Sequence, residues 1–310
     1  MAGTAFRAAE RLYRGVSLES APPSLLDPRR GPLDPSVATP LPLIGLDLVA
    51  YELVAFPGVV LIPDALSMQE QRAWTAACLT RYSGSRSNLH AEYVLPMRGD
   101  SSLWALSQKD VEAVPKPGRP SATYADLMRR LRWTTLGYHY DWTAHAYTPG
   151  DEEPFPDDLA DLCVRFARAL GHDTYAAEAA IINFYGPKDT LSGHVDYSER
   201  DHVAPLLSFS LGNAAVFLVG GLTRDVEPAA LLLRSGDCVV MRGKARLAYH
   251  GVPKIFAGTT PQELWDNPDA PDSRINDYVR INRINMNIRQ VEEYNAGGQP
   301  AVRAPATIDG

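Results

Sequence analysis

The stretch Arg283-Ile284-Asn285-Met286-Asn287-Ile288-Arg289 alternates polar and apolar side chains without interruption. Successive side chains of a β-strand point to opposite faces, so this pattern predicts a strand with one apolar and one polar face. The apolar face belongs against a hydrophobic core, whereas two arginines on the other face are costly to bury unless an anion meets them. Because guanidinium groups bind carboxylates bidentately, we expect a small dicarboxylate beside this strand; the alternative is a strand whose charges face solvent.

Short apolar runs precede this strand from Ala177 onward, and Gly, Pro or charged turns separate them. Many short strands at such spacing are typical of a β-sandwich or a jelly roll. The expected strands are residues 180–185, 206–211, 215–219, 230–233, 238–241 and 283–291.

Helices are expected before residue 177, which makes the predicted fold class α+β. Ser67 and Glu70 form a capping-box pattern, so a helix is expected to begin there and to reach about Tyr82. The other expectations for this half are a buried strand at residues 58–62, an irregular segment at 83–120, and helices at 124–131 and 157–170.

Composition divides the chain into four expected segments. Residues 16–45 are rich in proline, which is typical of a linker or of an extended arm lying on a surface. The first 15 residues carry arginines in an amphipathic pattern, which fits either a mitochondrial presequence or a docking helix. The segments are an N-terminal helix and Pro-rich arm (1–45), an extension of mixed helices and loops (46–176), a jelly-roll core (177–294) and a flexible tail (295–310).

The 310 residues have the composition of an ordinary globular protein, with 45% hydrophobic and 22% charged side chains. A formal net charge of -7 argues against indiscriminate coating of nucleic acid, which needs a broad cationic surface, but allows a local basic groove. Three cysteines without a CxxC motif predict buried thiols and an intracellular, reducing location, with nucleus, cytoplasm and mitochondrion left open. No membrane span is expected, because no apolar run approaches ~20 residues.

Gly193-His194-Val195-Asp196 and the distant Tyr249-His250-Gly251 contain the parts of a metal site. Residues two apart on a strand point to the same side, so His194 and Asp196 can face one ion that His250 reaches from another strand. Two histidines and one carboxylate leave positions open on Fe(II), which suits O₂ chemistry, and zinc accepts the same ligands. The alternative is a surface pair of His194 and Asp196 with an unrelated core histidine. The accompanying arginine strand favours the metal site.

Together these motifs resemble the AlkB family of Fe(II)/2-oxoglutarate dioxygenases, and most closely the branch that contains animal AlkB homologue 1. The resemblance runs from about residue 5 to residue 292 and is densest from residue 130. It includes Ala5-Phe6-Arg7 and Leu12-Tyr13-Arg14, which favours a native helix over a presequence. The other matching segments are residues 131–140, 182–185, 193–199, 205–210, 235–237, 246–253 and 283–291.

The resemblance implies a double-stranded β-helix (jelly roll) with flanking N-terminal helices and a substrate-recognition extension. It also implies Fe(II) and 2-oxoglutarate as cofactors and O₂ as a co-substrate. Core packing is the alternative role for the two aromatic residues among the implied contacts. The implied residues are His194, Asp196 and His250 for iron and catalysis; Asn183, Tyr185, Arg283, Asn285 and Arg289 for 2-oxoglutarate; and Trp133 and Tyr140, with Glu199 and Arg246 as weaker candidates, for the substrate.

The activity that the resemblance implies is oxidative demethylation of N-methylated nucleobases, which releases formaldehyde and succinate. The expected substrates are N6-methyladenine in DNA and 1-methyladenine in transfer RNA. A base inside a duplex cannot reach such a site, so it has to be flipped out or unpaired, and the aromatic stretch from Trp133 to Trp142 is expected to stack on it. Two alternatives stay open: hydroxylation of a protein or of another modified base, and non-catalytic binding of nucleic acid or chromatin.

Overall fold

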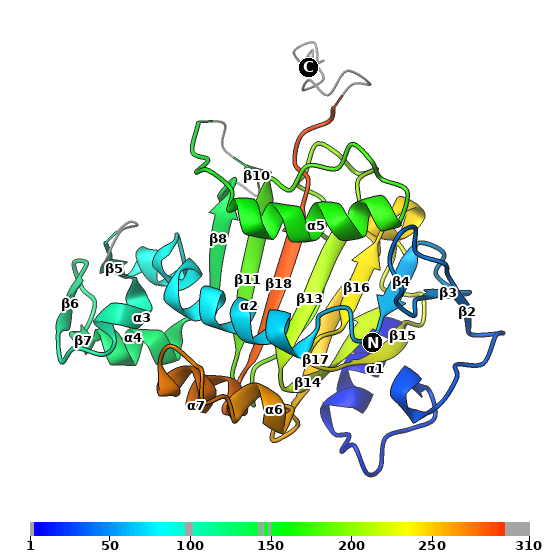
Figure 1. The fold of residues 1–310 in the computed structure, drawn as a ribbon, viewed down its shortest axis with the longest axis horizontal. Helices are drawn as coiled ribbons and strands as arrows, with labels where there is room; N and C mark the ends of the chain where they lie inside the picture. The colour runs from blue at the N-terminus through cyan, green and yellow to red at the C-terminus, as the bar shows by residue number, and fades with distance from the viewer. Residues whose placement is uncertain (1–2, 97–101, 142, 144–145, 148–149, 295–310) are drawn as a thin grey trace.

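Two β-sheets face one another in the computed structural model, which describes residues 3–96, 102–141, 143, 146–147 and 150–294 (Figure 1). The larger sheet has, in spatial order, β2 (Ala38–Pro40), β3 (Tyr51–Leu53), β4 (Val59–Ile62), β16 (Cys238–Met241), β13 (Leu206–Gly212), β18 (Arg283–Arg289), β11 (Ala179–Tyr185) and β8 (Trp133–Gly137). The smaller sheet has β1 (Leu25–Leu26), β15 (Ala229–Leu233), β14 (Ala214–Val219), β17 (His250–Phe256) and β12 (Leu191–His194).

Helices cover the outer faces of both sheets, so the described fold is layered. In Figure 1, α2 (Met68–Thr80) and α5 (Asp157–Ala169) lie across the larger sheet, and α1 (Ala5–Arg14) packs on the smaller one. The remaining helices are α3 (Leu103–Leu106), α4 (Tyr124–Arg130), α6 (Gln262–Trp265) and α7 (Ser273–Ile281), with short 3-10 turns at Pro28–Arg30, Tyr82–Gly84, Asn88–Ala91 and Gly243–Leu247. Among the residues that the structure describes, no helix has the length and apolar character of a membrane span.

The alternation predicted for β18 is confirmed. Ile284, Met286 and Ile288 are buried in the core between the larger sheet and its helices. Arg283 and Arg289 face the opposite way, into a cavity between the two sheets. A core lies on each side of the sheet, so the strand is buried on both faces and its polar side requires polar partners.

Most predicted elements are confirmed to within about two residues, including the capping box between Ser67 and Glu70 at the start of α2. The helix ends at Thr80, slightly before the predicted end. The prediction of an irregular segment at residues 83–120 is wrong in part, because this segment contains α3 and two strands of a three-stranded sheet. The small sheets are formed by β5 (Tyr93–Val94), β6 (Glu112–Pro115) and β7 (Ala122–Thr123), and by β9 (Tyr140–Asp141) and β10 (Ala146–Tyr147).

The Pro-rich arm adds a strand to each sheet. Strand β1 pairs in parallel with β15, and β2 pairs antiparallel with β3. Strands β3, β4 and β8 also precede residue 177 and belong to the larger sheet. The division of the chain at residues 45, 176 and 294 stays a prediction, and the predicted tail at 295–310 lies outside the described residues, as does Trp142.

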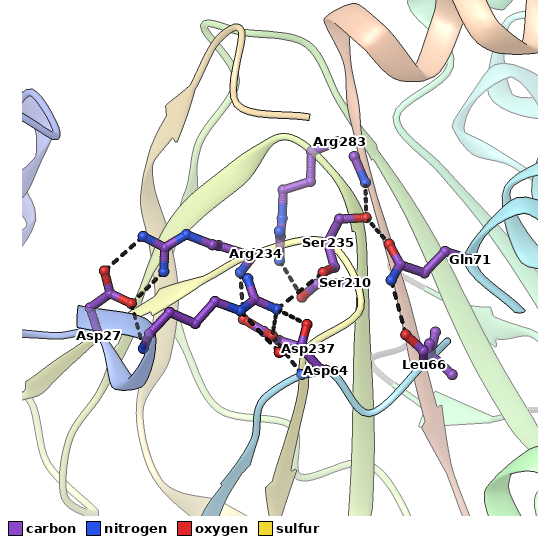
Figure 2. A network of polar contacts seen from close by, with 11 residues as sticks. Asp27, Asp64, Leu66, Gln71, Ser210, Arg234, Ser235, Asp237 and Arg283 are labelled. Carbon is purple, nitrogen blue, oxygen red and sulfur yellow. Dashed lines mark hydrogen bonds and ion pairs between the residues drawn. The ribbon is translucent and has the colours of Figure 1, made fainter. Parts of the chain in front are cut away.

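Ion pairs fix the arm to the turn between β15 and β16. Asp27 accepts a hydrogen bond of 2.7 Å from Arg234, and Arg29 donates one of 2.7 Å to Asp237. Arg29 also pairs with Asp64, which precedes α2. Figure 2 shows this network, in which Arg234 lies between Asp27 and Asp237. The arm is therefore bound by charge pairs as well as by strand pairing.

Helix α1 supports strand β12 from outside the sandwich. Its Phe6 ring is 1% exposed and Tyr13 is 4% exposed, so the docking-helix prediction is confirmed for this segment. The carboxylate of Glu10 accepts a 2.7 Å hydrogen bond from the backbone N–H of Gly193. A Cβ atom on Gly193 would lie 2.5 Å from Cε1 of Phe6, so only glycine fits beneath this ring.

Replacing Gly193 with alanine is therefore expected to lower the free energy of unfolding by about 1–3 kcal/mol, because the added methyl group overpacks a buried contact. Urea unfolding of the variant and the wild type measures the change. Gly15→Ala is the matched control, since its nearest non-neighbouring atom would lie 3.8 Å from the new Cβ. Equal stability of Gly193→Ala and the wild type would contradict this packing.

The three cysteines Cys78, Cys163 and Cys238 are free and buried, as predicted. Burial raises the pKa of each thiol above its ordinary value. A thiol held in its protonated form is a poor nucleophile and a poor metal ligand, so these residues serve as small apolar core side chains.

Candidate metal and co-substrate site

Three side chains converge where β12 meets β17. His194 is the register partner of His250 on the neighbouring strand, and Asp196 follows β12 by two residues. Asp196 Oδ1 lies 3.6 Å from His194 Nε2, and Asp196 Oδ2 lies 3.9 Å from His250 Nε2. One ligand atom from each of the three lies within 4.8 Å of the others, a grouping that suits a single metal ion.

Backbone carbonyls orient both imidazole rings. His194 Nδ1 donates to Ser192 O and His250 Nδ1 donates to Ala248 O, each at 3.0 Å. The Nε2 atoms are thereby left as acceptors that face the carboxylate, the tautomer a metal ion requires. Burial, together with the neighbouring His194, lowers the pKa of His250 to about 4. The His250 ring is therefore neutral at pH 7 and available as a ligand.

A buried charge network surrounds Asp196. Arg289 Nη1 lies 3.1 Å from Asp196 and 3.0 Å from Glu199, and Arg246 donates 2.9 Å hydrogen bonds to Glu199 and to the backbone carbonyl of Asp196. Burial raises the pKa of Asp196, but Arg289 and the two histidines outweigh it and hold that pKa well below its usual range. Asp196 is therefore ionised whenever a cation approaches.

Glu199 and Arg246, the weaker of the expected substrate-side residues, belong to this buried network. Glu199 is 4% exposed and Arg246 is 1% exposed, and both are engaged in the network around the carboxylate ligand. Tyr147, which no sequence motif signalled, also donates a 2.9 Å hydrogen bond to Glu199. Both oxygens of Glu199 thus accept hydrogen bonds from the protein, while the residue also lines the cavity, so its substrate role stays a prediction.

Arg283 occupies the same cavity and differs from Arg289 in its partners. Its guanidinium donates only to neutral oxygens, at 2.8 Å to Ser210 Oγ and 3.2 Å to Asn213 O. Its Nε has no hydrogen-bond partner, and no carboxylate of the described residues pairs with it. Burial lowers the pKa of Arg283 to about 10. A buried cation without a counter-ion indicates that an anion belongs here.

A separate set of hydrogen bonds lies near Arg283 and Ser210. Figure 2 shows Arg283 above Ser210, beside Ser235 and Gln71. Ser235 donates a 2.7 Å hydrogen bond to Gln71, and Gln71 in turn donates one of 2.9 Å to Leu66 O. Because Ser235 also accepts a 3.0 Å hydrogen bond from the backbone N–H of Gly212, these contacts connect the end of β13 to the start of α2.

The other predicted co-substrate residues stand on neighbouring strands. Tyr185 on β11 is the register partner of Arg283, and burial raises the pKa of its phenol to about 12. Asn285 donates hydrogen bonds to Ser208 Oγ at 2.8 Å and to Phe209 O at 3.0 Å. Asn183 faces Asn285 at 3.4 Å. The structure therefore brings all five predicted co-substrate residues to one cavity wall.

The cavity between the sheets has a volume of about 1070 Å³, enough for a small co-substrate and a base-sized group together. Trp133 and Tyr140 line it on the side of β8 and β9, as predicted. Tyr140 also accepts a 3.3 Å hydrogen bond from Ser198 and stacks edge-on with Tyr147, with ring centroids 5.5 Å apart. Sequence analysis did not assign several residues that also line it: Ser208, Phe217, Leu222, Arg224 and Tyr249.

Comparison with known families identifies this arrangement. The model of the 2OG-Fe(II) oxygenase superfamily matches residues 58–289, which include all three candidate metal ligands. The chain belongs to this superfamily. It is therefore a dioxygenase whose family uses Fe(II) and 2-oxoglutarate, and the candidate metal site stands where such an enzyme needs one.

Curated relatives place this dioxygenase in the AlkB family, in agreement with the predicted resemblance. It is 37% identical over 270 residues to the nucleic acid dioxygenase ALKBH1 of Mus musculus, covering 80% of this chain and 69% of that protein. It is 35% identical to the DNA N(6)-methyladenine demethylase ALKBH1A of Arabidopsis thaliana (76% and 75% covered) and 35% identical to the tRNA demethylase abh1 of Schizosaccharomyces pombe (76% and 79% covered).

A solved structure shares the fold. The structure of OsALKBH1 superposes with a TM-score of 0.52 at 22% identity, covering 76% of this chain and 97% of that one. At this identity the likeness supports the fold alone, and the predicted α+β jelly-roll class is confirmed.

Proposed function

We propose that this dioxygenase removes N-linked methyl groups from nucleobases in nucleic acid, with N6-methyladenine in DNA and 1-methyladenine in transfer RNA as the two candidate substrates. The observation that carries the proposal is one cavity in which the His194–Asp196–His250 group, an unpaired buried arginine and two aromatic rings meet. The relatives from A. thaliana and S. pombe are named for demethylation of DNA and of tRNA, respectively, which supports the substrate class.

The metal roles follow from the donor atoms. His194, Asp196 and His250 would hold Fe(II) through two neutral nitrogens and one anionic oxygen, a set that leaves positions free for other ligands. Asp196 Oδ2 is buried, faces Arg289 Nη1 at 3.1 Å and lies 3.9 Å from His250 Nε2, so it stands where positive charge is already stabilised. Arg289, Glu199 and Arg246 keep this carboxylate ionised and in place.

The co-substrate roles follow from charge. A carboxylate of 2-oxoglutarate would pair with Arg283, whose only partners in the protein are neutral, beside the phenol of Tyr185. Nε and Nη2 of Arg289 are also buried without partners, so the keto-acid end would lie toward this arginine and the metal. Asn183 and Asn285 complete the polar wall between the two arginines.

The aromatic residues on one side of the cavity would bind the substrate base. Trp133 and Tyr140 would stack on an extruded base and hold its methyl group toward the metal ligands while excluding water. When bound, Fe(II) and 2-oxoglutarate supply, with O₂, the oxidation of the methyl group to a hydroxymethyl group, which leaves as formaldehyde while the co-substrate becomes succinate and CO₂. The protein's own contribution is to bind, orient and enclose the reactants.

A side-by-side turnover assay tests the proposal. Purified protein is incubated with Fe(II), 2-oxoglutarate and oligonucleotides carrying N6-methyladenine or 1-methyladenine, as single-stranded, bulged and duplex DNA and as transfer RNA. Release of formaldehyde in proportion to succinate is expected from at least one unpaired substrate. Absence of formaldehyde across the whole panel would refute the proposal, and 2-oxoglutarate consumption that only a protein substrate increases would favour the hydroxylase alternative.

A further inference from the structure

Three arginines, Arg7, Arg11 and Arg14, lie exposed along α1 and have no role in the cavity. Most arginines of the described chain form ion pairs, for example Arg86, Arg130 and Arg234. No carboxylate of the described residues pairs with the three on α1. In a protein of net charge -7, an uncompensated row of cations is an unusual surface that suits an anionic partner.

The row of arginines stands on one side of the helix. At about 100° per residue, the three side chains fall within a sector of about 60°, and Glu10 lies about 40° from its nearer edge. Glu10 accepts the hydrogen bond from Gly193, directly before the metal ligand His194. The arginine row therefore flanks the side of α1 that touches strand β12.

Contacts connect the same helix to the rim of the cavity. Phe6 donates a 3.0 Å backbone hydrogen bond to the carbonyl of Arg224, and the Phe6 and Tyr249 rings lie 6.3 Å apart. The guanidinium of Arg224 donates a 2.9 Å hydrogen bond to Gly193 O and lies 5.2 Å from the Tyr249 ring centroid. Arg224, Tyr249 and Gly193 all line the cavity. The helix that carries the arginine row thus packs directly against residues of the cavity wall.

We propose that Arg7, Arg11 and Arg14 bind successive phosphates of the strand that carries the methylated base, next to the extruded nucleotide. This inference rests on the proposed function. The row spans about 10 Å at 1.5 Å per residue, the length over which a single strand presents about two or three phosphates. Guanidinium groups without competing carboxylates are the side chains best suited to phosphate oxygens.

A lipid surface is the other partner that a basic amphipathic helix can recruit, and the packing of α1 disfavours it. Lipid binding requires the apolar face of the helix to enter the membrane interface. In this protein Phe6 and Tyr13 are buried against the smaller sheet, together with side chains of β14 and β15. The two aromatic side chains that a membrane interface would take up are therefore unavailable, although Leu12 remains 57% exposed.

The salt dependence of binding tests the inference. The affinity of the full-length protein for a single-stranded 15-mer with one N6-methyladenine is measured by fluorescence anisotropy over a series of salt concentrations. Each phosphate contact contributes about 0.7 to the slope of log K against log salt for a single strand, so the triple variant R7Q/R11Q/R14Q is expected to lower the slope by about 2. Each single variant is expected to lower it by about 0.7. Arg168→Gln, an exposed charge on α5, is the control and keeps the wild-type slope.

Two further measurements separate this role from damage to the fold. Thermal stabilisation by 2-oxoglutarate is expected to be equal in the triple variant and the wild type. The preference of the wild type for the 15-mer over a methylated trinucleotide is expected to fall in the triple variant, because only the longer strand reaches α1.

Three outcomes overturn the inference. They are an unchanged slope, an equal loss of binding for the 15-mer and the trinucleotide, and arginine-dependent sedimentation with anionic vesicles in place of a salt-slope effect. Failure of the wild type to demethylate any oligonucleotide is a different result and would refute the proposed function itself. A wild type that demethylates while the triple variant keeps its slope would leave the proposed function intact and refute only the phosphate row.

Discussion

Replacing Arg283 with methionine is expected to raise the 2-oxoglutarate concentration for half-maximal turnover by at least about 30-fold. Removing one partner of a buried charge pair costs about 2–5 kcal/mol of binding free energy, and the co-substrate carboxylate would lose its cationic partner. The free energy of unfolding of the free protein, in contrast, should not fall. Arg283 is 1% exposed and has no carboxylate partner among the described residues, so an apolar side chain of similar length is expected to keep or increase the free energy of unfolding.

Initial-rate kinetics at varied 2-oxoglutarate, together with thermal melts with and without it, measure both effects. A ligand that binds only the folded state raises the melting temperature, so wild type should gain stability from 2-oxoglutarate and Arg283→Met should not. Arg283→Lys is the matched variant, because it keeps the charge but loses the planar fork, and an intermediate requirement is expected. An unchanged requirement in Arg283→Met would show that the anion binds elsewhere.

Replacing His194 with alanine is expected to abolish stoichiometric iron binding and to reduce turnover by more than about 100-fold. Losing a residue that only orients a metal ligand typically costs about 10- to 100-fold, and losing the ligand itself should cost more. The side chain of His194 is 35% exposed, so its removal leaves little buried volume unfilled and the fold should persist. The two remaining ligands, Asp196 and His250, would hold the ion through only one nitrogen and one carboxylate.

Metal content by atomic absorption and far-ultraviolet circular dichroism test this prediction on the same sample. His172→Ala removes an imidazole that lies outside the cavity and is the control. Full iron content in His194→Ala would contradict the ligand assignment. Normal nucleic-acid function in a His194→Ala protein without iron would instead favour the non-catalytic alternative.

Sequence patterns predicted the structure correctly where a regular alternation of polar and apolar residues continued along a whole strand. The seven-residue alternation of β18 predicted both the buried apolar face and the polar face that lines the cavity, because a period of two fixes the face of every residue. The spacing of His194 and Asp196 likewise predicted that they would lie together. The distance between Asp196 and His250 could only be expected from the fold class, and the structure supplies it.

Residues whose role depends on tertiary contacts were not predictable in the same way. Glu199 and Arg246 flank the metal motifs in sequence, which suggested substrate contacts, yet the structure shows that they also form a buried charge network with Arg289 and Asp196. Tyr147 belongs to a strand of two residues, too short for any period to identify. Strand β1 of the Pro-rich arm escaped prediction because its pairing with the distant β15 leaves no local pattern. Strand β2 has only three residues, too few to show a period.

The pairing of that arm has a consequence for biosynthesis. Asp27 and its partner Arg234 are 207 positions apart, so the arm finds its place only after most of the polypeptide has been translated. Before β1 pairs with it, β15 is an exposed border of the smaller sheet, and open borders of this kind recruit strands from other molecules. The part of the arm that contains β1 therefore covers this border late in folding. Weakening it should show first as aggregation of newly made protein, before any loss of catalytic capacity in the folded molecules.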